Sequence, residues 1–124
     1  MVIMSIDDSA ATRSFAKAAV DVLGFEFVEA ENGAEARKLL EEGTKKVDLI
    51  LLDWNMPVMD GMTFLKWLKE ESDFKDVPVT MVTTEVERAK VIEAIGGGAK
   101  NYLMKPFTQE ELVGKIMESL GMGL

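Results

Sequence analysis

The residues best able to do chemistry follow short apolar runs of the sequence. The run LILL leads into Asp53, the apolar N-terminal segment leads into Asp7 and Asp8, and Lys105 follows a third run near the C-terminus. In open α/β sheets, ligands collect just beyond the carboxyl ends of the strands. A carboxylate in that position is better placed to react than to support the fold, which makes Asp53 the first candidate for a reactive group.

The elements that must position these residues alternate regularly along the chain. Short apolar runs separated by longer segments of helical period indicate a parallel sheet covered on both faces. The strands are predicted at Val2–Ile6, Glu26–Ala30, Asp48–Asp53, Val79–Thr83 and Asn101–Met104. Right-handed crossovers turn this βα order into a flavodoxin-like (βα)5 three-layer sandwich of class α/β, with parallel strand order 2-1-3-4-5. A length of 124 residues predicts one domain, residues 1–124.

Helices are predicted between the strands from apolar spacing and from residues typical of helix ends. Three predicted starts pair a capping side chain with a glutamate three residues later: Asn32 with Glu35, Thr84 with Glu87, and Thr108 with Glu111. The core-facing residues of the first helix are expected to be Phe15, Ala18, Ala19, Val22 and Leu23. Those of the fourth helix are expected to be Ala89, Ile92 and Ile95.

This strand order brings the candidate residues to one crevice. The first and third strands are neighbours where the order reverses, so Asp7, Asp8 and Asp53 should meet. Three carboxylates in one pocket repel each other, and an all-oxygen donor set without histidine or cysteine favours Mg²⁺ over zinc. Thr83 ends the fourth strand and Lys105 follows the fifth, so a hydroxyl and an ammonium flank the same crevice. Both groups suit a phosphoryl group.

The composition excludes several classes of function. The chain has no histidine and no cysteine, which removes imidazole or thiolate zinc sites, histidine-activated nucleophiles and a phosphohistidine of its own. Any phosphohistidine chemistry must therefore come from a partner. The formal net charge of −8 argues against nucleic-acid binding. The apolar N-terminal segment is too short for a signal peptide or a membrane span, so we expect a cytoplasmic protein without membrane contact.

Four segments of the chain resemble the receiver domain of two-component response regulators, most closely the single-domain, CheY-like chemotaxis regulators. They are SIDDS, DWNMPVMDG, MVTTE and NYLMKPF, and they occur in the order and approximate spacing of that family. The resemblance implies that Asp53 is the phosphoacceptor. It also implies that Asp7, Asp8, Asp53 and the backbone carbonyl of Asn55 hold Mg²⁺.

The resemblance extends to residues that sense the phosphoryl group. It implies that Thr83 and Lys105 contact this group, and that Tyr102 is an aromatic switch that fills the space left when Thr83 moves. Asn55 and Glu85 occupy the positions that tune phosphate lifetime in the family, and they match its fast-cycling chemotaxis members. We therefore expect spontaneous dephosphorylation within seconds to minutes.

The function implied is a phosphorylation-activated signalling switch that catalyses only its own phosphorylation and dephosphorylation. Its phosphodonor would be a chemotaxis-type sensor histidine kinase, and its output partner the flagellar motor switch protein; a phosphatase is a further partner of such proteins. The expected output surface comprises Val86, Val91, Tyr102, Met104 and Lys115.

Other interpretations of these residues remain open at this point. Asp7 and Asp8 could cap a helix, Thr83 could be an ordinary strand residue, Lys105 a solvated loop lysine, and Tyr102 a packing residue. Pro106 favours an inward Lys105, because the family commonly has a cis Lys-Pro bond at this point.

The same chemistry also fits other functions. A phosphorelay intermediate or a phosphate sink would lack contact with the motor. A haloacid-dehalogenase-type hydrolase is disfavoured, because Asn55 stands where those enzymes usually carry a second acid.

Two features depart from the family pattern. Ser5 replaces an apolar residue of the first strand, and Gly96, Gly97 and Gly98 replace a tighter turn after the fourth helix. The glycine run is expected to loosen the end of that helix, because ordering glycine costs backbone entropy. The sequence leaves open the cognate kinase, the output partner and the oligomeric state.

Overall fold

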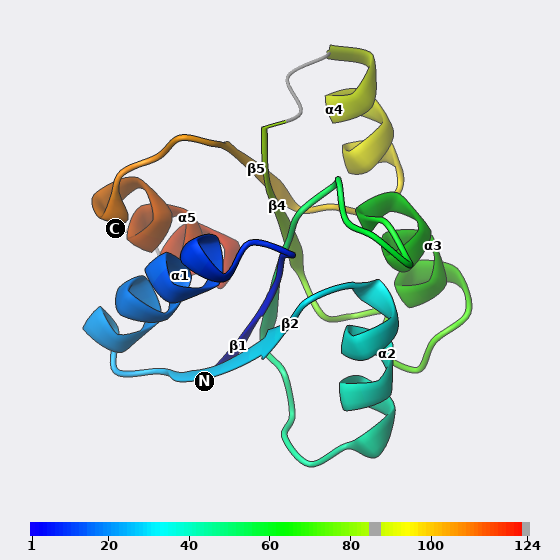
Figure 1. The fold of residues 1–124 in the computed structure, drawn as a ribbon, viewed down its shortest axis with the longest axis horizontal. Helices are drawn as coiled ribbons and strands as arrows, with labels where there is room; N and C mark the ends of the chain where they lie inside the picture. The colour runs from blue at the N-terminus through cyan, green and yellow to red at the C-terminus, as the bar shows by residue number, and fades with distance from the viewer. Residues whose placement is uncertain (85–87, 123–124) are drawn as a thin grey trace.

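The computed structural model describes residues 1–84 and 88–122 of the chain. Strands and helices alternate through these residues (Figure 1). The strands are β1 (Val2–Ile6), β2 (Glu26–Ala30), β3 (Leu49–Leu52), β4 (Val79–Thr83) and β5 (Asn101–Met104). The helices are α1 (Ala10–Val22), α2 (Gly33–Glu42), α3 (Gly61–Glu70), α4 (Arg88–Gly96) and α5 (Gln109–Ser119). Among the described residues, no helix is both long and apolar enough to cross a membrane.

The strands form one parallel sheet with the order β2-β1-β3-β4-β5, which confirms the predicted flavodoxin-like fold. Helices α1 and α5 cover one face, while α2 and α3 cover the other (Figure 1). Strand β3 is one residue shorter at each end than predicted, so Asp48 and Asp53 lie just outside it. In the register of β1 and β3, Ile6 lies opposite Leu52, and the residues that follow these two emerge at the same edge.

The buried face of α1 differs from the sequence prediction. Ala19 is buried as expected and Leu23 is partly buried, but Phe15, Ala18 and Val22 are exposed. The helix instead buries Arg13, Ala16, Ala19 and Val20. Apolar residues form two overlapping stripes on this helix. Apart from Arg13, the buried stripe carries small apolar side chains, which suit close packing of α1.

The prediction for the face of α4 was also wrong. Ala89 is exposed, and Ile92 and Ile95 are 60% and 46% exposed. Among the described residues of this helix, only Ala94 is fully buried. Helix α4 therefore leaves two bulky apolar side chains, Ile92 and Ile95, in solvent among charged neighbours.

Two of the three predicted helix starts are confirmed. The Asn32 side chain accepts a hydrogen bond from the Glu35 amide at 2.8 Å. Thr108 and Glu111 form a reciprocal capping box with hydrogen bonds of 3.1 and 3.0 Å. Of the third pair, Glu87 lies outside the described residues.

The structure shows the environment of Ser5 and of the glycine run after α4, the two departures from the family pattern. Ser5 is 3% exposed within β1. Helix α4 ends at Gly96, and Gly98 has a φ of +111°, where a Cβ atom would lie 2.9 Å from Cγ of Lys69. A side chain at position 98 would therefore strain the backbone and require the side chain of Lys69 to shift.

Candidate functional site

Three carboxylates converge at the carboxyl edge of the sheet. Asp7 directly follows β1 and Asp53 directly follows β3; oxygens of these residues and of Asp8 lie within 4.8 Å of one another. Asp7 and Asp53 are 2% and 6% exposed, whereas Asp8 is exposed. The Asp53 amide donates to the Ile6 carbonyl at 3.0 Å, which continues the pairing of β1 and β3 to Asp53. The predicted convergence is confirmed.

The acids do not cap helix α1. Its N-cap is Ser9, whose side chain accepts from the Thr12 amide at 3.2 Å. Asp7 instead accepts a hydrogen bond from the Ser9 amide at 2.9 Å through Oδ1. The second carboxylate oxygen of Asp7 is thereby turned toward the crevice, where it meets Lys105.

Lys105 binds two of the three acids. Its Nζ lies 2.8 Å from Oδ2 of Asp7 and 3.4 Å from Oδ2 of Asp53, with 17% of the lysine side chain exposed. The peptide bond between Lys105 and Pro106 is cis. The Lys105 amide donates to the Thr83 carbonyl at 3.0 Å, which ties the lysine to the end of β4. Lys105 is therefore not a solvated loop lysine.

The electrostatics of the crevice leave excess negative charge. Burial raises the pKa of Asp7, and the charge of Asp53 adds to this effect, although hydrogen bonds from Lys105 and Ser9 oppose it. Burial lowers the pKa of Lys105, but its hydrogen bond to Asp7 and the charges of both acids outweigh burial and raise the pKa above its ordinary value. Lys105 thus stays charged at neutral pH and offsets one of three carboxylates. A donor set of carboxylate oxygens suits a hard cation such as Mg²⁺.

The loop after β3 holds Asp53 tightly. The Trp54 amide donates to Oδ1 of Asp53 at 2.8 Å, and the Gly61 amide donates to the Trp54 carbonyl at 2.8 Å. Asn55 is exposed in this loop. Because Trp54 occupies Oδ1, the oxygen of Asp53 that faces Lys105 is Oδ2.

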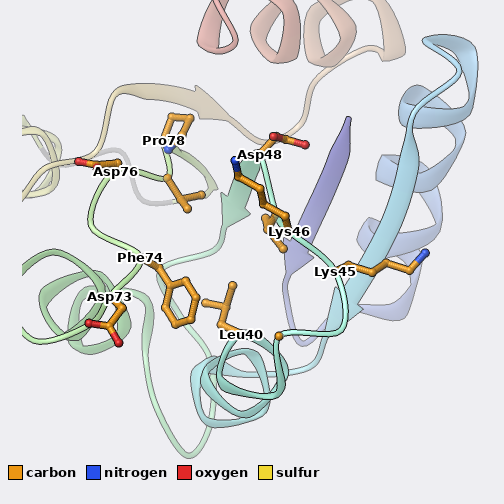
Figure 2. A pocket seen from close by; sticks show the side chains of 11 residues that line it. Leu40, Lys45, Lys46, Asp48, Asp73, Phe74, Asp76 and Pro78 are labelled. Carbon is orange, nitrogen blue, oxygen red and sulfur yellow. The ribbon is translucent and has the colours of Figure 1, made fainter.

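The cavity shown in Figure 2 lies at the opposite end of the sheet. It has a volume of about 630 Å³ and lies beside the amino ends of β3 and β4. Its walls include Leu40 and Phe74, while the charged groups of Lys45, Asp73 and Asp76 point in different directions (Figure 2). These charges do not converge on a common point, so the acidic crevice is the stronger candidate for a functional site.

The model of one protein family covers most of the chain, including the three acids and Lys105. Residues 3–117 match the model of the response regulator receiver domain. The chain belongs to the response regulator receiver family. The acidic triad of this receiver is typical of the magnesium site of the family. The receiver is therefore a phosphorylation-controlled signalling protein rather than a metabolic enzyme, and its family implies a histidine kinase as partner.

Similar proteins include chemotaxis regulators. The receiver is 40% identical to a CheY homologue of Campylobacter jejuni over 124 residues, covering 99% of this chain and 95% of the relative. It is 39% identical to chemotaxis protein CheY1 of Helicobacter pylori over 122 residues, covering 98% of each chain. The structure of Vibrio cholerae CheY4 aligns with a TM-score of 0.87 and 33% identity, covering 96% of this chain and 98% of that one.

The expected switch residues lie near the crevice. Thr83 ends β4 and is fully buried at the same sheet edge as Asp53. Tyr102 lies on β5, partly buried against the core on the side of α2 and α3. Its register partner is Met81, while Thr83 pairs with Met104. Tyr102 is thus set back from the edge by two residues along the strand.

The expected output residues form only part of an exposed face. Met104 is 42% exposed, whereas Val91 and Tyr102 are partly buried. Lys115 donates to Oδ1 of Asn101 at 3.3 Å and pairs with a neighbouring glutamate. Val86 and Glu85 lie outside the described residues. Sequence reasoning assigned Ile92 and Ile95 of α4 to the core, although both side chains are exposed.

Sequence reasoning also missed a buried arginine beneath the acids. Arg13 is 8% exposed, and its Nη1 donates to the backbone carbonyl of Asp7 at 2.7 Å. Its spacing from Ala16 and Val20 places it on the buried stripe of α1, so the correct choice of stripe would have identified it.

Proposed function

We propose that this receiver, acting as a single cytoplasmic domain of residues 1–124, takes a phosphoryl group onto Asp53 from a phosphohistidine of a chemotaxis-type kinase. The phosphorylated form then docks on the flagellar motor switch protein. The observation that carries the proposal is the convergence of three carboxylates with Lys105 at one sheet edge. The similarity to chemotaxis proteins of Campylobacter jejuni and Helicobacter pylori supports the choice of pathway.

The transfer step requires Asp53 to act as a nucleophile. Oδ2 is the reacting oxygen in this proposal, since Oδ1 accepts a hydrogen bond from the Trp54 amide. An oxygen–phosphorus bond forms as the phosphorus–nitrogen bond of the donor breaks, and the leaving imidazole takes up a proton.

Cations must neutralise the phosphoryl charge during this step. Asp7, Asp8, Asp53 and the Asn55 carbonyl would hold Mg²⁺, which supplies charge neutralisation. Lys105 supplies a second positive charge from its present place beside Oδ2 of Asp53. The excess negative charge of the acids favours binding of the cation, and the cation together with Lys105 then offsets the charge of the phosphoryl group.

The phosphoryl dianion then changes the packing around β4 and β5. The Thr83 hydroxyl moves to bond a phosphoryl oxygen, and Tyr102 fills the space it leaves. This movement alters the surface formed by α4, β5 and α5, including Val86, Val91, Met104 and Lys115. Asn55 and Glu85 help to orient a hydrolytic water, which limits the phosphorylated state to seconds or minutes; a phosphatase would shorten it further.

Phosphorylation by acetyl phosphate with Mg²⁺ tests the acceptor. Asp53→Asn should abolish the mass increase of one phosphoryl group, because an amide oxygen is not a comparable nucleophile. Asp60→Asn is the matched control, since Asp60 lies in the same loop but caps α3. The control should still accept the group. Equal phosphorylation of Asp53→Asn at another residue would refute the assignment.

Retention on immobilised flagellar motor switch protein tests the partner. The receiver should be retained only after phosphorylation, because the docking surface forms with the switch. Equal, weak retention of both forms would instead favour a phosphorelay intermediate or a phosphate sink.

A further inference from the structure

The guanidinium of Arg13 is buried beneath the acidic crevice and bonded on two sides. Nη1 donates to the backbone carbonyl of Asp7 at 2.7 Å, and Nε donates to Oε1 of Glu29 at 2.7 Å. Nη2 lies 4.0 Å from Glu31. The guanidinium therefore connects α1, the end of β1 and the end of β2.

The carbonyl that Arg13 binds belongs to the peptide unit that joins Asp7 to Asp8. The orientation of this peptide sets the direction in which both side chains leave the backbone. Asp7 has further restraints, since its carboxylate binds the Ser9 amide and Lys105. Asp8 is exposed at the mouth of the crevice, so the position of its carboxylate depends more strongly on the peptide that carries it.

We propose that Arg13 is a positioning residue for the divalent-cation site, and that Glu29 keeps its guanidinium in place. The inference rests on the proposed function, because it assumes that the acids bind a cation. Groups that orient metal ligands without touching the metal commonly change metal affinity by about 10- to 100-fold when they are removed. Arg13 is suited to this role because it binds the ligand backbone and leaves the carboxylates free.

The charge of Arg13 and its proposed positioning role have opposite effects on Mg²⁺ affinity. A guanidinium near the crevice repels a cation, so its charge alone would weaken Mg²⁺ binding. If charge dominated, Arg13→Gln would bind Mg²⁺ more tightly than the wild type. If positioning dominates, Arg13→Gln binds Mg²⁺ more weakly. The sign of the change therefore separates the two effects.

The experiment is a Mg²⁺ titration of the full chain followed by Trp54 fluorescence in a Trp67→Phe background. We expect Arg13→Gln to raise the Kd about 10- to 100-fold. Arg13→Lys should lie between this variant and the wild type, since one ammonium cannot reproduce both hydrogen bonds. Arg37→Gln is the control, because Arg37 stacks on Trp67 at 4.9 Å, away from the acids. An unchanged or lower Kd for Arg13→Gln would overturn the inference.

Two further measurements separate positioning from loss of fold. Thermal unfolding without Mg²⁺ establishes that each variant is folded at the titration temperature. At saturating Mg²⁺, Arg13→Gln should accept phosphate from acetyl phosphate at close to the wild-type rate, with only its Mg²⁺ requirement raised. A reduced rate at saturating Mg²⁺ with an unchanged Kd would overturn the inference.

A variant at the partner of Arg13 covers the case in which Arg13→Gln does not fold. Glu29→Ala removes a half-exposed acid and leaves the guanidinium with its bond to Asp7. Glu29→Gln is the charge control, because it removes the same charge but keeps a side-chain oxygen that can accept a hydrogen bond from Nε of Arg13. The Kd should rise several-fold more in Glu29→Ala than in Glu29→Gln, and equal Kd values of the two variants would overturn the inference. The proposed function fails separately, when the wild type itself binds no Mg²⁺.

Discussion

Gly61 lies in close contact with the backbone of Asp53, the proposed phosphoacceptor. A Cβ atom at this position would lie 2.2 Å from the carbonyl oxygen of Asp53 and 2.9 Å from Cα of Trp54. Both contacts are with backbone, which cannot move aside as a flexible side chain can. The start of α3 therefore approaches the acceptor closely only because residue 61 has no side chain.

Gly61→Ala should displace Asp53 and slow phosphorylation by acetyl phosphate at least tenfold. It should also lower the free energy of unfolding by about 1–3 kcal/mol, the usual cost of overpacking. Gly114→Ala is the matched control, because nothing lies within 4 Å of a Cβ atom at that position of α5. The control should raise stability by about 0.5–1 kcal/mol in urea denaturation and leave phosphorylation unchanged. If Gly61→Ala matched the wild type in both assays, the expectation that a Cβ atom at position 61 displaces Asp53 would be wrong.

Individual site residues differed in how far the sequence could identify them. Asp7, Asp53 and Lys105 each follow a strand, and parallel strands bring such residues to one edge, so their convergence was predictable. Arg13 was not identified, because its role depends on which face of α1 meets the sheet. That choice is made by packing between distant parts of the chain, which local spacing does not specify.

At the scale of elements, strands were easier to predict than helix faces. The buried strands are short and rich in apolar and β-branched residues, so their limits are easy to recognise, and β3 differed by only one residue at each end. Helices α1 and α4 each carry more apolar residues than the sheet can cover. In α4 the covered residue is Ala94, while Ile92 and Ile95 remain in solvent. From the sequence alone, these additional apolar residues are predicted to be buried, whereas in the structure they lie at the surface.

The exposed residues of α4 lead to a prediction about docking. Ile95→Gln should leave stability within about 0.5 kcal/mol of the wild type, as expected for a surface position. It should still weaken retention of the phosphorylated receiver on motor switch protein, because it places an amide within an apolar face. Val22→Gln on α1 is the matched control, since Val22 is also an exposed aliphatic residue of a helix. Equal retention of both variants would show that docking does not use this face of α4.

At the scale of the whole molecule, the carboxyl edge of the sheet concentrates charge repulsion in one place. Carboxylates from the segments after β1 and β3 are held together by the fold, with Lys105 as their bonded cation. In the unfolded chain Asp53 separates from Asp7 and Asp8, so the repulsion between Asp53 and these two acids lowers the stability of the folded state. A cation that binds the folded state should restore that stability through linkage.

Mg²⁺ should therefore raise the free energy of unfolding, by about 2.7 kcal/mol when its free concentration is 100 times the Kd. Without Mg²⁺, Asp8→Asn should be more stable than the wild type, because one repelling charge is gone. When Mg²⁺ is added, the free energy of unfolding of this variant should rise only slightly. Asp73→Asn is the control, since it removes an acid at the opposite end of the sheet and should respond to Mg²⁺ as the wild type does. Thermal unfolding with and without Mg²⁺ measures all three proteins. An Asp8→Asn variant that gains as much as the wild type would show that Asp8 is not a ligand of the cation.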